Sequence, residues 1–162
     1  SRRGLKANSS GDVSMSVVVA WPERNCGWAM TFSRNGMLVF TPRMRNHHGG
    51  MVRLGDYIYA GNGHNNGLPI CLEWKTGTVK WEQSERPGKE SAAVIAADGE
   101  LYFRWQDGTM GLIEASPAGY KLNGSFKLPV VQGPSWPHPV IVDGLMYIRD
   151  HDTMLCYDVR AK

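Results

Sequence analysis

The feature of this sequence that most limits its fold is an internal repeat. Three segments align with one another, Met51–Tyr59, Val94–Tyr102 and Pro139–Tyr147, and each consists of two short apolar runs on either side of a two-residue turn. The tyrosines that close the three segments lie 43 and 45 residues apart. A repeat of about 40–45 residues is one supersecondary unit that buries its apolar face only by stacking on the next unit. The sequence therefore predicts a stack of similar small sheets.

Each repeat has the composition of antiparallel strands joined by tight turns. The turns consist of Gly and Asp, which tolerate the positive φ angles of a type I′ hairpin, at Gly55–Asp56, Asp98–Gly99 and Asp143–Gly144. A third apolar run with an acidic residue follows every hairpin, and a fourth run, Glu73–Trp81, follows in the first unit. Four antiparallel strands at this period are typical of a β-propeller blade. We expect an all-β partial β-propeller of about three four-stranded blades, the last without its outer strand.

The segment Glu73–Trp81 resembles the repeat of pyrroloquinoline quinone-type (quinoprotein-dehydrogenase-like) β-propellers, whose blades share an acid, a Thr-Gly turn and a tryptophan. Asn46–Gly50, Ser135–Pro139 and Leu155–Val159 are similar to the closing blades of secreted bacterial proteins of this class. The resemblance covers about residues 44–162 and implies a periplasmic or secreted location. A quinone site needs a complete ring with inward cofactor ligands, which this sequence does not show. No pyrroloquinoline quinone is expected.

The repeat also divides the chain. We expect blades at about residues 46–88, 89–133 and 134–162, preceded by a β-rich segment over 13–45 and a flexible polar tail over 1–12. Three blades cannot close a ring, because propellers close with about four to eight, and an open stack leaves sheet edges unpaired. We therefore expect a homodimer or higher oligomer that completes the ring. Met37–Thr41, from the same chain or its partner, would supply the missing outer strand.

Charge and composition exclude several classes of partner. The net charge is +3 and the basic residues are scattered, which argues against nucleic acid and allows a mild preference for small anionic molecules. No apolar run approaches the ~18–20 residues of a membrane span, and the basic N-terminus does not read as a signal peptide. The three cysteines lie far apart and predict inert thiols within strands. The compartment stays open.

The histidines carry the main functional hypothesis. Strands of a blade alternate in direction, so the loop that enters the first strand and the loop between the second and third strands lie at one end of the sheet. All five histidines fall in such loops. Imidazole is the commonest protein ligand for zinc, so we expect a divalent metal, zinc above all, held by His48, His64, His138 and His151. Asp150 and Asp152 would activate a bound water or orient an imidazole.

Basic residues near these loops suggest a substrate. Arg43, Arg45 and Arg149 flank the histidines, and with His47 they would bind a small anionic substrate. A metal that lowers the pKa of water beside arginines that hold negative charge suits a phosphoester. The sequence thus predicts a metal-dependent hydrolase of the phosphoesterase type. No HExxH or other metal spacing is present, so the prediction depends on topology alone.

A second class of function fits the same residues. The histidines also suit polar loop positions on a wet rim, and the arginines suit solvated surface charge. The chain would then be a non-catalytic propeller used for binding or assembly, a piece of a larger secreted protein. The recurring aromatic residues are expected to fill the gaps between blades: Tyr59, Tyr102, Tyr147, Trp74, Trp81, Trp105 and Trp136.

Overall fold

The structure, a computed structural model, describes residues 18–20, 29–34, 37–41 and 44–160. In this part of the chain the sheets are antiparallel, and the helical structure is one short 3-10 turn, η1 (His64–Asn66). No helix among these residues is long and apolar enough to cross a membrane. The prediction of an all-β partial β-propeller is confirmed.

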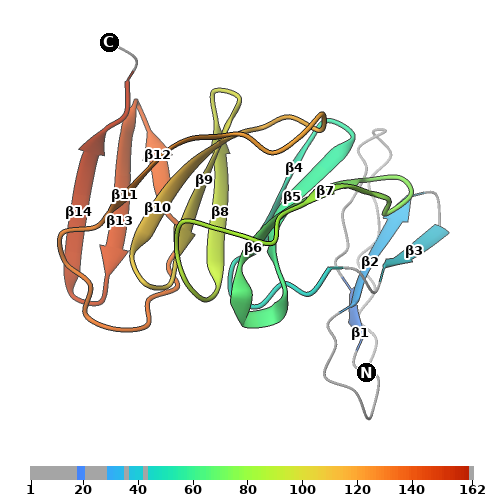
Figure 1. Ribbon diagram of the computed structural model, residues 1–162, viewed down its shortest axis with the longest axis horizontal. Helices are drawn as coiled ribbons and strands as arrows, with labels where there is room; N and C mark the ends of the chain where they lie inside the picture. Colours follow the sequence, from blue (N-terminus) through green and yellow to red (C-terminus); the bar gives the residue numbers. More distant parts are fainter. Residues whose placement is uncertain (1–17, 21–28, 35–36, 42–43, 161–162) are drawn as a thin grey trace, which may run out of the picture.

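Three sheets stand side by side in chain order (Figure 1). The first blade has the order β4-β5-β6-β7, with strands Met51–Leu54, Tyr57–Asn62, Leu68–Glu73 and Val79–Glu82. The second blade pairs β8 to β11, which are Ala92–Ala97, Glu100–Trp105, Thr109–Glu114 and Leu122–Lys127. The third blade has three strands, β12 to β14, which are Val140–Val142, Leu145–Asp150 and Thr153–Asp158.

A further sheet precedes the blades. It contains β1 (Val18–Ala20), β2 (Ala29–Arg34) and β3 (Met37–Thr41) in that order. The strand expected at Met37–Thr41 is present, but it pairs with β2 and not with the third blade. Within this chain the strand is the edge strand of the N-terminal sheet; that it supplies the missing outer strand of a third blade, in this chain or a partner copy, stays a prediction. The polar tail expected over residues 1–12 lies outside the described residues.

The predicted hairpin turns form in all three blades, but the turn of the first blade is not type I′, because Gly55 takes a left-handed φ of 58° and Asp56 does not. In the second and third blades, both turn residues take left-handed φ angles, 51° at Asp98 and 79° at Gly99, then 51° at Asp143 and 73° at Gly144. These are the angles of a type I′ turn, whose twist matches that of the flanking strands. Each turn brings its tyrosine opposite an apolar residue of the preceding strand, as in Val52 opposite Tyr59.

Apolar side chains fill the gap between the first two blades. The largest buried cluster joins Tyr59, Cys71 and Trp81 of the first blade to Phe103 and its neighbours in the second. Two indoles also fasten the blades together. Trp105 Nε1 donates to the Gly67 carbonyl at 2.9 Å, and Trp81 Nε1 donates to the Ser116 carbonyl at 2.8 Å. Most of the aromatic residues expected between blades therefore do pack there.

The other two clusters bury the opposite face of the first blade and the gap between the second and third blades. Ile58, Ile70 and Leu72 on the opposite face of the first blade pack with Met44 and Trp74. Between the second and third blades, the buried residues are Met110, Leu128, Met146 and Ile148. Each of the first two blades is thus covered on both faces.

The predicted site residues lie at one end of the row of blades. The loops that enter first strands and those between second and third strands all lie at the lower end of Figure 1, and the tight hairpin turns lie at the upper end. We call the lower set the loop end; it consists of residues 44–50, 63–67, 106–108, 128–139 and 151–152. The topological prediction that the histidine loops share one end is confirmed.

The contact between the first two blades should dominate the stability of this fold. Phe103→Ala should lower the free energy of unfolding by about 3–5 kcal/mol, because the phenyl ring is fully buried and leaves a cavity. The matched control is Phe126→Ala on β11, whose ring is 43% exposed and should cost about 1 kcal/mol or less. Urea unfolding followed by circular dichroism measures both; equal losses would contradict this account of the core.

Candidate functional site

A buried ion pair joins the second and third blades at the loop end. Arg104 near the end of β9 donates to Asp150 at the end of β13, with 2.8 Å between Nη2 and Oδ2, and both side chains are fully buried. Burial lowers the pKa of the Arg104 guanidinium, and the adjacent Asp150 carboxylate opposes that shift. A charge in such a place is stable only when it is paired and hydrogen-bonded.

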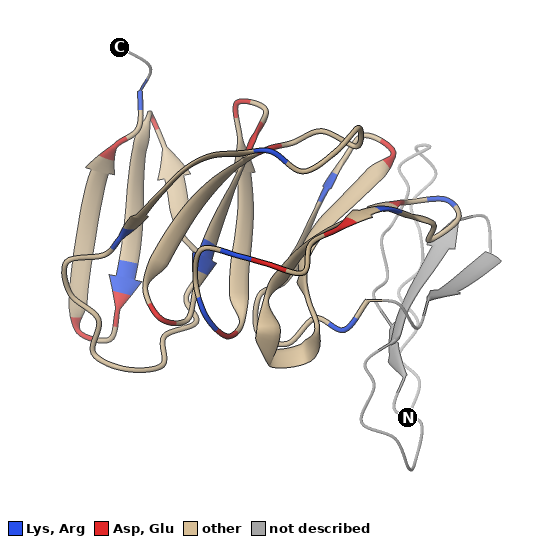
Figure 2. Ribbon diagram, viewed as in Figure 1, with Lys and Arg blue, Asp and Glu red and all other residues tan. Residues whose placement is uncertain are grey.

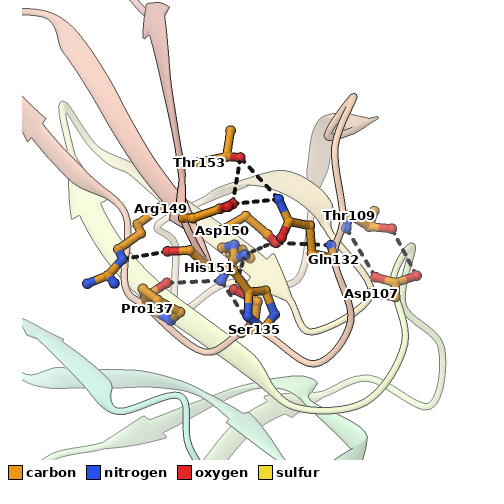
Figure 3. A network of polar contacts seen from close by, with 11 residues as sticks. Asp107, Thr109, Gln132, Ser135, Pro137, Arg149, Asp150, His151 and Thr153 are labelled. Carbon is orange, nitrogen blue, oxygen red and sulfur yellow. Dashed lines mark hydrogen bonds and ion pairs between the residues drawn. The ribbon is translucent and has the colours of Figure 1, made fainter.

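The same ion pair holds the long loop between the second and third blades (Figure 3). Arg104 also donates to the Ser135 carbonyl at 2.9 Å, the Ser135 hydroxyl at 2.8 Å and the Pro137 carbonyl at 3.2 Å. The second oxygen of Asp150 accepts from the Gln132 backbone N–H at 3.1 Å. Both carboxylate oxygens of Asp150 are therefore engaged. A role for Asp150 in activating water stays a prediction, and this geometry supports an anchor in its place.

Asp152 occupies the opposite kind of environment. Its side chain is exposed, and its Oδ1 accepts from Gln132 Nε2 at 2.7 Å. This hydrogen bond, followed by one with Thr153, lowers the pKa of the Asp152 carboxyl. Asp152 thus fixes the other side of the same loop, two residues along the chain from the buried anchor.

Three of the five histidines come together where the first blade meets the second. His47 packs against His48 with ring centroids 3.8 Å apart, and it stacks on His64 at 4.5 Å. His48 in turn contacts the indole of Trp136, 4.7 Å between centroids. His64 enters the group because its backbone N–H donates to the Arg45 carbonyl at 2.8 Å, which ties the two loops of the first blade together. We call these four residues the histidine–tryptophan surface.

A chain of hydrogen bonds selects the tautomer of the neutral His47 ring. The Ser91 hydroxyl donates to Asn65 Oδ1 at 2.7 Å, so its oxygen is left to accept from His47 Nδ1 at 2.8 Å. The proton of the neutral ring then resides on Nδ1, and Nε2 keeps its lone pair. Burial, and then the neighbouring His48 and His64, lower the pKa of His47. The hydrogen bond with Asn65 acts in the opposite direction and is the smaller effect.

The remaining predicted ligands lie in different settings. The His138 ring covers Gly50, where an added Cβ would lie 2.8 Å from His138 Cε1, so the entry loops of the first and third blades meet. His151 is exposed in the turn between β13 and β14, where its carbonyl accepts from Arg149 Nε at 2.8 Å. Within residues 44–160, no three His, Cys, Asp or Glu side chains are arranged to hold a metal ion.

The stacking explains why the histidines do not form a ligand set as they stand. A metal ion binds in the plane of an imidazole ring, at a nitrogen lone pair, and three such lone pairs must converge on it. His47 and His64 instead lie nearly face to face, with 29° between their planes. Zinc binding by His48, His64, His138 and His151 stays a prediction, and it would require these rings to turn.

The arginines expected to bind substrate are spread along the loop end. Arg45 and Arg149 are exposed, and Arg43 lies outside the described residues. Figure 2 shows acidic and basic residues scattered over the ribbon of the blades. Arg45 is the arginine nearest in sequence to the histidine–tryptophan surface. These side chains provide separate positive charges and not one anion pocket.

Two features of the site were not predicted from the sequence. Arg104 stands inside the strongly apolar run Leu101–Trp105, and a charged residue in such a run is the signal that could have revealed a buried ion pair. Trp136 was expected between blades but is 45% exposed, with its Nε1 donating to Gln106 Oε1 at 2.7 Å. That expectation is wrong because the loop that carries Trp136 crosses the loop end and does not enter the gap between sheets.

An apolar hollow lies away from the histidines. It has a volume of about 320 Å³ between the second and third blades and is lined by Tyr102, Met110, Phe126 and Met146 among others. The hollow is lined almost wholly by apolar atoms, and the ionisable side chain on its wall is Tyr102. Burial raises the pKa of that phenol, so the hollow offers no acid or base near neutral pH.

Comparison with known proteins identifies the fold and no family. No family model and no curated protein matches this sequence. Among solved structures, BamB from Moraxella catarrhalis is similar, with a TM-score of 0.63 and 14% identity over 90% of this chain and 46% of that one. This chain therefore spans about half the length of that protein. At this identity the likeness supports the β-propeller arrangement and carries no activity.

The buried ion pair predicts that substitutions of two nearby carboxylates, Asp150 and Asp152, change the free energy of unfolding by very different amounts. Asp150→Asn should lower the free energy of unfolding by about 3–5 kcal/mol, because Arg104 is left as a buried, unpaired charge. Asp152→Asn is the matched control and should change stability little, because that carboxylate is exposed. Chemical unfolding measures both, and a stable Asp150→Asn protein would refute the anchor role.

The histidine contacts predict an unusual titration. The pKa of His47, measured by NMR of its ring protons, should lie below the ordinary 6.5, and His64→Ala should raise it by removing a neighbouring charge and some of the burial. His151→Ala, in the exposed turn between β13 and β14, should leave it unchanged. Because the unfolded chain keeps a pKa near 6.5, the contribution of His47 to stability is fully present above that pH and is lost as the pH falls from there through the lower pKa of the folded state. A rise in stability on acidification would contradict this.

Proposed function

We propose that this chain is a binding scaffold: part of a β-propeller whose loop end holds a partner and performs no chemistry of its own. The observation that carries the proposal is that polar groups of the loop end are engaged in contacts within the protein. The two carboxylate oxygens of Asp150 accept hydrogen bonds from Arg104 and Gln132. His47 is hydrogen-bonded to Ser91 and stacked on His64. These contacts make the loops rigid. Among the described residues, Asp152 is the carboxylate beside an imidazole, that of His151, and its Oδ1 is engaged by Gln132.

The exposed groups of the loop end suggest the chemistry of the partner. His48 and Trp136 present an imidazole and an indole in contact with each other, and Arg45 is exposed in the same loop as His48. Aromatic rings and arginine are the residues that most often carry binding energy in protein interfaces. Arginine also matches carboxylate oxygens well. The proposed partner is therefore a protein segment with carboxylate and aromatic side chains.

The alternative of a metal-dependent hydrolase has one observation in its favour. The Ser91–Asn65 chain orients His47 and leaves its Nε2 lone pair free, as outer hydrogen bonds do for histidines that bind metals. Zinc at this place would polarise an anionic ester and lower the pKa of its water. The scaffold is preferred because the neighbouring rings stack and do not converge.

Two measurements distinguish these functions. For the hydrolase, turnover of p-nitrophenyl phosphate is measured with added zinc, with a chelator, and in His48→Ala and His138→Ala. The scaffold predicts no turnover that depends on zinc or on these residues. Turnover that is lost both on chelation and in the two variants would establish the hydrolase and refute the scaffold.

For the scaffold, calorimetry measures the affinity for an acidic peptide probe, Glu-Glu-Tyr-Glu-Glu. Arg45→Ala and Trp136→Ala should each weaken binding by about fivefold, which corresponds to about 1 kcal/mol. Arg53→Ala is the control, because Arg53 is also exposed but its Nε donates to the Gly55 carbonyl in the hairpin turn at the opposite end of the first blade. Binding that is equal in all three variants would contradict a partner site at the loop end.

A further inference from the structure

Within the described residues, no other sheet packs on the outward face of the third blade, which carries mostly apolar side chains together with Arg149 and Asp158. Alternate residues of β12, β13 and β14 point to opposite faces of the sheet. One face packs on the second blade through Met146 and Ile148. The other carries Val140, Val142 and Met154, which are 58%, 50% and 63% exposed. Contiguous exposed apolar side chains of this kind mark an interaction surface.

The same face occurs in the first blade, where it is buried. In the third blade the strand register places Val140, Tyr147 and Cys156 in one row across the sheet. In the first blade it places Val52, Tyr59 and Cys71 in the corresponding row. The two rows consist of the same residue types in the same order.

The second blade covers the row of the first. Tyr59 and Cys71 are fully buried, in one cluster with Val94, Leu101 and Phe103 of β8 and β9. Burial raises the pKa of the Cys71 thiol to about 11. Cys156, its counterpart in the third blade, is exposed. A side-chain row that needs a neighbouring sheet in one blade is thus presented without one in the other.

We propose that the outward face of the third blade docks a further propeller blade, a sheet that presents branched aliphatic and aromatic side chains as β8 and β9 do to the first blade. The interface would resemble the one already present between the first two blades, with Arg149 at the position where Gly61 of the first blade lies against Ala92 of β8. Within the described residues, β14 also has one edge with no paired strand, where the fourth strand of the third blade would add. This inference concerns a sheet face and does not depend on whether the loop end binds a partner.

A second copy of this chain fits the face less well. The face that covers the Val–Tyr–Cys row of the first blade is the side of the second blade that points toward the first blade. The equivalent side of the first blade carries Ile58, Ile70 and Leu72, which are already buried with Met44 and Trp74. Among the described residues a second copy therefore has no free face of the required kind. The homodimer expected from the sequence becomes the competing outcome of the test.

The test lengthens the chain by a copy of the second blade, which is known to pack on the Val–Tyr–Cys row of the first blade. A second copy of residues 74–133 is attached directly after Asp158. Asp158 ends the third strand of the third blade, at the position that Glu73 occupies in the first blade. The added segment contains no cysteine. Maleimide labelling, read by peptide mass spectrometry, should find Cys156 labelled about tenfold more slowly in the lengthened chain, because reaction needs an accessible thiolate. Cys71 serves as the internal standard for a covered thiol.

The matched control carries Phe103→Asp in the added copy only, and it should leave Cys156 as reactive as in the chain of 162 residues. Unchanged reactivity of Cys156 in a folded lengthened chain would overturn the proposal. The unlengthened chain gives a second measurement that does not depend on the extension folding. A monomer in which Cys156 is labelled about tenfold faster than Cys71 supports the proposal. A dimer that protects Cys156, and that Val142→Lys dissociates, would show that a second copy covers the face and would overturn it.

Discussion

The structure depends on one constraint: a small antiparallel sheet with two apolar faces is stable only when each face is covered by another layer. In this chain the second blade satisfies the constraint on both sides, against Tyr59 and Cys71 on one face and Met146 and Ile148 on the other. The row of blades follows directly from it. Burial of a core aromatic side chain contributes about 3 kcal/mol or more, so a few such contacts outweigh the marginal stability of any single sheet.

Polar contacts then decide how the blades and loops are held in place. The Arg104–Asp150 pair is 2.8 Å long and fully buried, and an ion pair of this kind contributes more to a unique geometry than to stability. Its partners Ser135, Pro137 and Gln132 all belong to the loop between the second and third blades. The loop crosses the loop end in one fixed path as a result. That path brings Trp136 onto His48.

The loop end is therefore a rigid surface with a few exposed aromatic and basic groups. This is the common pattern of propellers and other scaffolds in which function resides in loops held by a rigid frame. The histidines illustrate how the same residues serve either chemistry or structure. Stacked on each other and tied to Ser91, they stabilise the junction of two loops; turned so that their lone pairs converge, they would bind a metal.

The sequence by itself determined the strands, the hairpin turns and the end of the sheets at which each histidine lies. These properties are local: alternation of apolar residues, Asp and Gly at positive φ, and the alternating direction of successive strands decide them. Only the tertiary structure decided that Asp150 faces Arg104, 46 residues away in the chain, that Trp136 is exposed, and that β3 pairs with β2. Such pairings depend on how sheets and loops pack in three dimensions, and no short-range pattern in the sequence encodes that distance or direction.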